Sequence, residues 1–269
     1  MNPLTAGTSN AGSGILQSLG SNQNSINDIQ TQLSTNKKIL DPAQQGVVTR
    51  LQSQVTSFAA AHDNIAKAQN VLNVASTGLQ SISSLLTQMQ DLANKANDAT
   101  MTSTDAAKLN QTFQHLLAQV QSTATNSKVD SVGLLVNTAT QLAIQTGLTT
   151  ADITNISTVS SDTTTLGIST LSVTNATSAA GAITALASAL QTISTSQSSI
   201  AADQMALQTV DDQDASISQN LQNTIDTIQK PDAAALQMQL QNANNQQSMN
   251  YYLISQMNQE ASTVLTIFR

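Results

Sequence analysis

Apolar residues recur every seven positions along one long stretch of the chain, from Leu51 to Ala96. A second apolar series follows three residues after the first in each repeat. Together the two series are Leu51, Phe58, Ile65, Leu72, Leu79, Leu86 and Ala93, with Ala61, Ala68, Ala75, Ile82, Met89 and Ala96. This spacing is a heptad with apolar a and d positions, which predicts a helix with a single apolar stripe. At ~1.5 Å per residue the helix is roughly 70 Å long, so its stripe needs a long partner helix.

The partner lies near the other end of the chain, where a second heptad runs through Leu186, Ile193, Ile200, Leu207, Asp214, Leu221 and Ile228. We therefore expect a mainly α fold, a long antiparallel helical or coiled-coil rod. Its helices are predicted over residues ~46–98, ~104–125 and ~179–229, with Ser103 or Thr104 capping the second of them. Between them, residues ~126–177 are rich in Thr, Ser, Val, Ile and Gly. This composition predicts a small β-rich insertion with strands over 142–145, 152–156 and 170–173.

Two prolines separate the ends of the chain from this rod, because proline interrupts a helical hydrogen-bond ladder. Pro42 follows a terminal helix predicted over ~15–36, after a frayed segment 1–14, and Pro231 precedes a last helix capped by Asp232. We expect residues 1–41 plus 231–269 to form a discontinuous inner domain, a second coiled coil, and residues 42–230 an outer core domain. Isolated helices of this length are marginal in water, so the terminal pair should be disordered in a monomer and fold against other copies.

The terminal helices each have one apolar face, and we expect these faces to meet and to mediate polymerisation. The predicted subunit interface consists of Ile15, Leu19, Ile26, Leu33, Leu240, Ile254, Met257, Ala261, Leu265 and Phe268.

Composition limits the kinds of function that the chain can have. Of its 269 residues only 9% are charged and 2% aromatic, and the net charge is −7 with nine Lys and Arg. So few basic residues argue against nucleic acid as a partner. The absence of cysteine excludes disulfides and thiolate metal sites. No apolar run approaches the ~18 residues of a transmembrane helix, so we expect no membrane insertion. The first twenty residues lack the basic and apolar regions of an ordinary signal peptide.

Candidate catalytic or metal-binding residues are few. His62 and His115 lie on different predicted helices without a carboxylate cluster, which favours surface or interface imidazoles over metal ligands. Asp211, Asp212 and Asp214 form the densest acidic cluster, but the glycine and glutamate of a calcium loop are missing, which favours a solvated helical face. Asp214 occupies an a position, where a polar residue can fix the register, although a locally exposed seam is the favoured interpretation. We expect no enzyme activity, no cofactor and no metal.

Several short segments resemble bacterial flagellin, and specifically the short flagellins of alphaproteobacteria. The segment 33–39, Leu-Ser-Thr-Asn-Lys-Lys-Ile, resembles the family segment after the first helix, although Asn36 replaces the usual glycine. Segment 87–93, Thr-Gln-Met-Gln-Asp-Leu-Ala, is similar to the family's Gln-Arg-Val-Arg-Glu-Leu-Ala. Segments 142–147 and 166–173 resemble short strands of its outer core domain. The chain ends in Leu-Thr-Ile-Phe-Arg, similar to the family's Leu-Ser-Leu-Leu/Phe-Arg.

The resemblance implies a structural subunit that polymerises into the extracellular flagellar filament, with the terminal helices paired in its innermost layer. It implies no outer variable domain, since only ~50 residues separate the long helices. It also implies export through the flagellar export apparatus without a cleaved signal peptide, and contacts with an export chaperone, cap and hook-associated proteins. Two alternatives stay open: a hook–filament junction protein, which shares the terminal helices, and a non-flagellar coiled-coil surface or secreted protein.

Overall fold

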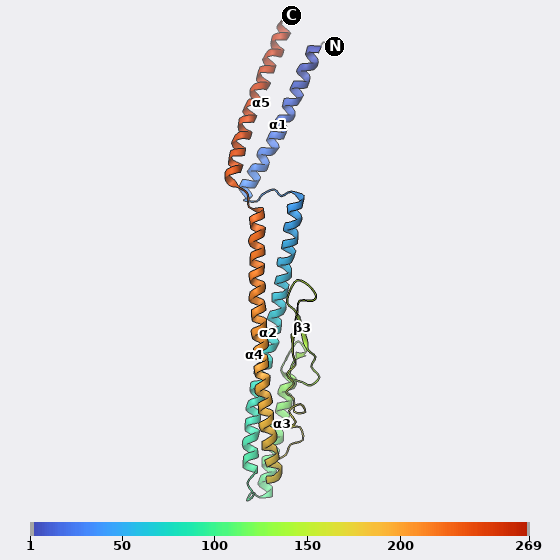
Figure 1. Ribbon diagram of the computed structural model, residues 1–269, viewed down its shortest axis with the longest axis vertical. Helices are drawn as coiled ribbons and strands as arrows, with labels where there is room; N and C mark the ends of the chain where they lie inside the picture. The colour runs from blue at the N-terminus through green and yellow to red at the C-terminus, as the bar shows by residue number, and fades with distance from the viewer. Residues whose placement is uncertain (1–2, 268–269) are drawn as a thin grey trace. The chain divides into compact units, whose positions relative to one another are not determined.

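The fold is mainly α, as predicted, with two small β-hairpins in the middle of the chain. The structure, a computed structural model, describes residues 3–267, with the side chains of 12–260, 262 and 263. Its helices are α1 (Pro3–Thr35), α2 (Pro42–Ala96), α3 (Ser103–Asn126), α4 (Ala176–Gln229) and α5 (Ala233–Ile267). Its strands are β1 (Lys128–Val129), β2 (Val132–Gly133), β3 (Leu142–Gln145) and β4 (Ile153–Ile156) (Figure 1).

The chain folds into two compact units, which are described separately. The terminal unit comprises Met1–Gln52 with Leu221–Arg269, and the central unit comprises Ser53–Asn220. Helices α2 and α4 contribute residues to both units.

The core of the central unit follows the predicted heptads. Every a and d residue of α2 from Phe58 to Ala96 is buried, and so are Leu186, Ile193, Ile200 and Leu207 of α4. Helices α2 and α4 lie side by side in this unit (Figure 1). The two helices run antiparallel. The Gln204 side-chain amide of α4 donates to Asn73 Oδ1 of α2 at 2.8 Å. The long antiparallel rod is therefore confirmed, because two apolar stripes of matching period exclude water along their shared length.

Helix α3 adds a shorter third element to the central unit and buries Phe113 and Val120. Its N-cap is Thr102, one residue before the expected Ser103 or Thr104, and the Thr102 hydroxyl accepts the Asp105 N–H. Asp105 in turn accepts a hydrogen bond from the Thr102 hydroxyl, which lowers its pKa. This reciprocal arrangement, which resembles a capping box, explains why the helix starts there.

The β-rich segment contains two antiparallel pairs, β1 with β2 and β3 with β4. The strands expected over 142–145 and 152–156 are present, but the strand expected over 170–173 is wrong. That stretch is irregular and is held by side chains instead of a neighbouring strand. Val173 is buried, and its N–H donates to the Asn110 Oδ1 of α3 (2.9 Å).

The ends of the helices in the terminal unit differ in part from expectation. Helix α1 begins at Pro3, earlier than the start predicted near residue 15, and the fraying predicted for residues 1–14 stays a prediction. Proline suits the first turn, where its missing N–H has no helical partner. It ends before Asn36, whose φ is +52°. This left-handed conformation suits glycine, the residue usual at this position in the resembled family, and asparagine adopts it at low cost. Asp232 caps α5 by accepting the N–H groups of Ala234 and Ala235, as predicted.

Within the described helical residues from Ala176 to Glu260, one 18-residue window has a mean hydropathy of 1.2. By its length and composition alone, this window could cross a membrane. The a-position side chains Leu186, Ile193 and Ile200 of this helical stretch are buried in the core of the central unit. Core helices pass the same test, so the window is weak evidence for a membrane segment.

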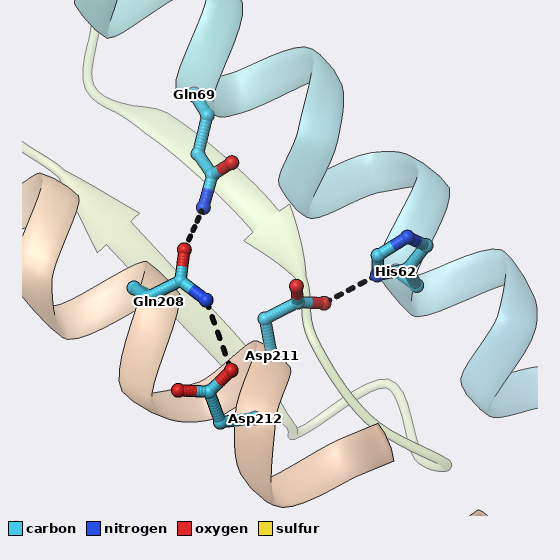
Figure 2. Close-up of polar contacts among 5 residues, drawn as sticks. All are labelled: His62, Gln69, Gln208, Asp211 and Asp212. Atoms are coloured by element: carbon cyan, nitrogen blue, oxygen red, sulfur yellow. Dashed lines mark hydrogen bonds and ion pairs between the residues drawn. The ribbon is translucent and has the colours of Figure 1, made fainter.

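Polar side chains bridge α2 and α4 along the edge of their apolar seam, as Figure 2 shows. His62 Nδ1 lies 2.6 Å from Asp211 Oδ1, and this hydrogen bond and the aspartate charge raise the His62 pKa. The Gln69 amide donates to Gln208 Oε1 (3.4 Å), and the Gln208 amide donates to Asp212 (2.9 Å). Of the two favoured interpretations, a surface or an interface imidazole, His62 fits the second, because it pairs with Asp211 across the α2–α4 interface.

Asp214 departs from the predicted solvated face. It lies at an a position of α4, is only 7% exposed, and its Oδ2 has no hydrogen-bond partner among the described residues. Burial raises the Asp214 pKa, and the charges of Asp211 and Asp152 raise it further. The locally exposed seam expected there is wrong, because the partner stripe of α2 continues past this point.

Candidate assembly surface

The inner face of α1 is set by seven positions with alternating spacings of three and four residues. These positions are Gly12, Ile15, Leu19, Asn22, Ile26, Ile29 and Leu33. Such spacing places side chains in one stripe along a helix. Ile26 and Ile29 are buried at 4% and 7% exposure, Asn22 is also buried, and the other four positions are half-buried.

The inner face of α5 has the same alternation. Its positions are Leu236, Leu240, Ala243, Gln247, Asn250, Ile254 and Met257. Leu236 and Ala243 are buried, and the remaining five are half-buried. None of the described positions of either face carries a charged side chain, so apolar packing and neutral hydrogen bonds hold the two helices together.

The two faces meet in an antiparallel pair, which we call the terminal seam (Figure 1). The Asn22 amide donates to the Ala243 carbonyl oxygen at 2.7 Å, and the Gln247 amide donates to Gln23 Oε1 at 2.6 Å. Further along, a Cβ added to Gly12 would lie 3.2 Å from Met257 Cε. Residue numbers that rise on one helix therefore face numbers that fall on the other.

The predicted interface residues with described side chains all lie on the terminal seam within one chain. On α1 these are Ile15, Leu19, Ile26 and Leu33, and on α5 they are Leu240, Ile254 and Met257. The side chains of Ala261 and Leu265, and the whole of Phe268, lie outside the described residues. That these residues mediate polymerisation stays a prediction.

Four buried seam residues are missing from that predicted set: Asn22, Ile29, Leu236 and Ala243. The alternating spacing of three and four residues could have identified all of them. Asn22 escapes a search for apolar residues because its buried side chain is an amide.

A second apolar surface lies on α5, facing away from the terminal seam. Met238, Met249 and Tyr252 are 62%, 64% and 63% exposed, and Leu253 beside them is 44% exposed. These positions fall between the seam positions, so at 3.6 residues per turn they lie on the other side of the helix. We call Met238, Met249, Tyr252 and Leu253 the outer face of α5. Clustered exposed apolar side chains of this size mark interaction surfaces in soluble proteins.

The described residues include no group of three or more His, Asp or Glu side chains arranged to hold a metal ion.

Comparisons with known proteins agree with this architecture. The family of the bacterial flagellin N-terminal helical region matches residues 8–135. Flagellin FljO of Caulobacter vibrioides is 27% identical over 262 residues, covering 94% of both chains. Flagellin FljK of the same organism is 26% identical over 275 residues, covering 99% of both, and a flagellin of Halalkalibacterium halodurans is 23% identical over 254 residues.

Among solved structures, the crystal structure of Bacillus cereus flagellin has a similar fold, with a TM-score of 0.52 at 24% identity. The similarity covers 56% of this chain and 88% of that chain. The paired terminal helices, the heptad rod and the near full-length similarity all agree: the chain is similar to bacterial flagellins in sequence and in fold.

Proposed function

We propose that this protein is a structural subunit of the bacterial flagellar filament and that its terminal helices carry the contacts by which copies polymerise. Proteins similar to it over almost their whole length are flagellins. A homopolymer needs each copy to present surface that another copy can bury.

The observation that carries the proposal is the exposed outer face of α5. Its four side chains Met238, Met249, Tyr252 and Leu253 are uncharged and largely uncovered in a single chain. Covering apolar side chains contributes roughly 25 cal/mol per Å² removed from water. Neighbouring copies of the same chain would cover this face repeatedly along a filament.

The thin terminal seam supports the same view. Among its described positions only Asn22, Ile26, Ile29, Leu236 and Ala243 are buried, in contrast to the continuous buried stripe of α2. A two-helix pair with so few buried residues is marginally stable alone. We therefore assign residues 1–41 plus 231–269 to the inner domain of the filament and residues 42–230 to its outer core domain.

The remaining parts of the proposal rest on the family. The protein acts as a structural component without enzyme activity, cofactor or metal, and is located in the extracellular flagellum. Its export through the flagellar apparatus without a cleaved signal peptide, and its contacts with chaperone, cap and hook-associated proteins, are further parts of the proposal.

Polymerisation of the purified chain tests the proposal. Soluble protein mixed with short filament fragments as seeds should elongate them into long helical filaments, observed by electron microscopy. Protein that stays monomeric in the presence of seeds, at concentrations where a flagellin of similar length polymerises, would overturn it.

A further inference from the structure

The terminal seam has a group of polar residues in its middle, between apolar positions at both ends. Asn22 and Asn250 occupy seam positions, and each donates across the seam: Asn22 to the Ala243 carbonyl oxygen and Asn250 to Ser18 Oγ at 3.4 Å. Gln247, also at a seam position, donates to Gln23. We call Ser18, Asn22, Gln23, Ala243, Gln247 and Asn250 the amide layer.

Asn22 is the most constrained member of the amide layer. It is 8% exposed, and its bond to the Ala243 carbonyl oxygen is 2.7 Å long. A backbone carbonyl has a second lone pair that can accept this bond beside its helical partner. The amide reaches the backbone because residue 243 is alanine, whereas a leucine or isoleucine would cover the carbonyl. A buried amide without a partner is costly, so Asn22 favours an alignment that places it at Ala243.

A shift of the helices by one heptad in either direction would break the layer. In one direction Asn22 would move opposite Leu236, whose larger side chain would obstruct the approach of the amide to a backbone carbonyl oxygen. In the other direction Asn22 would move opposite Asn250, which also carries an amide. Gln23 would move opposite Ile254 and Ser18 opposite Met257, so the bonds of these two residues would be lost. The purely apolar positions distinguish less well between the observed and the shifted alignments, because Ile, Leu and Met pack against one another in each of them.

We propose that the amide layer fixes the register in which α1 pairs with α5, with Asn22 as the specificity-determining residue. A single buried asparagine sets register in other coiled coils at a cost in stability. The inference rests on the proposed function, because it gives the layer a role in the surface that carries assembly: copies with α1 and α5 in one register present identical surfaces to their neighbours.

Distances between spin labels test the register directly, since the chain contains no cysteine and two can be introduced without competition. Gln30→Cys on α1 and Ser248→Cys on α5 are exposed positions, staggered along the helix axis. A one-heptad shift changes their axial offset by about 10 Å, at 1.5 Å per residue. Labelled chains are diluted into an excess of unlabelled wild-type protein, so that each distance comes from one chain, and are polymerised with seeds.

The labelled parent should give one narrow distance in the filament. Asn22→Leu should add a second population, displaced by up to about 10 Å, because the apolar seam then accepts more than one alignment. The matched control is Asn24→Leu, an exposed asparagine on the same helix, which should keep the single distance. Exclusion of Asn22→Leu chains from filaments that accept Asn24→Leu chains would also support the layer.

One unchanged narrow distance in Asn22→Leu filaments would overturn the inference and leave the proposed function intact. If the parent fails to polymerise, the proposed function fails, and the same labels on the soluble chains then decide the layer. A single distance in the parent that broadens in Asn22→Leu would support the layer, and equal distributions in both would overturn it.

Discussion

Gly78 lies in the middle of α2, where glycine is otherwise unfavourable, at the point where the chain after α3 crosses the helix. An added Cβ would clash with Ser127 Oγ, and it would lie 2.7 Å from Leu135 Cδ1 and 2.8 Å from Ser127 Cβ. No real side chain fits at these distances, so the close approach of the crossing chain requires glycine here.

Gly78→Ala should therefore destabilise the central unit by about 1–3 kcal/mol, as overpacking does elsewhere. Urea unfolding followed by circular dichroism measures the change. The control is Gly181→Ala on α4, where an added Cβ meets nothing within 4 Å. That variant should gain about 0.5–1 kcal/mol from better helix propensity. Equal effects of the two substitutions would contradict the packing that we describe at Gly78.

Asp214 gives the central unit a pH dependence whose sign follows from burial. Its pKa is raised in the folded chain, so its stabilising contribution is fully present below the unfolded value of 3.8 and is lost as the pH rises through the folded pKa. The charges that act on it are those of Asp211 on α4 and Asp152 before β4, and Asp211 in turn pairs with His62 on α2.

Asp214→Asn removes this titration and keeps the shape of the side chain. As the pH rises from 3.8 through the raised pKa of the folded chain, the wild-type free energy of unfolding should lose the contribution of Asp214, and the variant should not show this loss. The His62 pKa is also raised, so in both proteins His62 adds a decrease in the free energy of unfolding with rising pH. Asp212→Asn, at an exposed neighbouring position, is the control. Parallel pH profiles for wild type and Asp214→Asn would contradict the burial of the Asp214 carboxyl group.

At the scale of elements, the long helices are predictable because each heptad repeats the same constraint many times. Leu72, Leu79 and Leu86 each indicate the buried stripe independently, so a single exception does not hide it. Asp214 shows the limit of this argument: its identity favours exposure, whereas the partner helix beside it imposes burial.

The loops are less predictable because their structure depends on single contacts between distant residues. Residues 170–173 have the composition of a strand, but Asn110 of α3 satisfies the Val173 N–H and no strand lies beside it. Of the predicted interface residues, those with described side chains lie on the terminal seam. Asn22 could not be identified by apolarity, since its burial depends on the carbonyl group of Ala243.

The two units should differ in their resistance to proteases when the chain is monomeric. Few residues of the terminal seam are buried, whereas the central unit contains a continuous core. Limited proteolysis of verified monomer, analysed by mass spectrometry, should remove both ends and leave a core near residues 45–230. The same digestion of assembled filaments should spare the ends. Monomer ends as resistant as the centre would contradict the marginal stability of the terminal pair.

At the scale of the whole molecule, we assign folding to the central unit and assembly to the terminal helices. The central unit buries its heptads within one chain, and the terminal helices leave the outer face of α5 uncovered. We therefore expect each copy to become fully ordered only when neighbouring copies are added. The small number of charged residues, 9% of the chain, fits an assembly held by apolar and amide contacts.

Seeded polymerisation of Ile254→Asp tests this division most directly. Ile254 is half-buried in the terminal seam, and a carboxylate there costs on the order of 1–3 kcal/mol in every subunit. Polymerisation should be lost, while the circular dichroism and thermal melting of the monomer core stay as in wild type. Ser255→Asp adds the same charge at an adjacent exposed position and should still polymerise. Normal polymerisation of Ile254→Asp, or a monomer core that melts well below wild type, would contradict the assignment of assembly to the terminal helices.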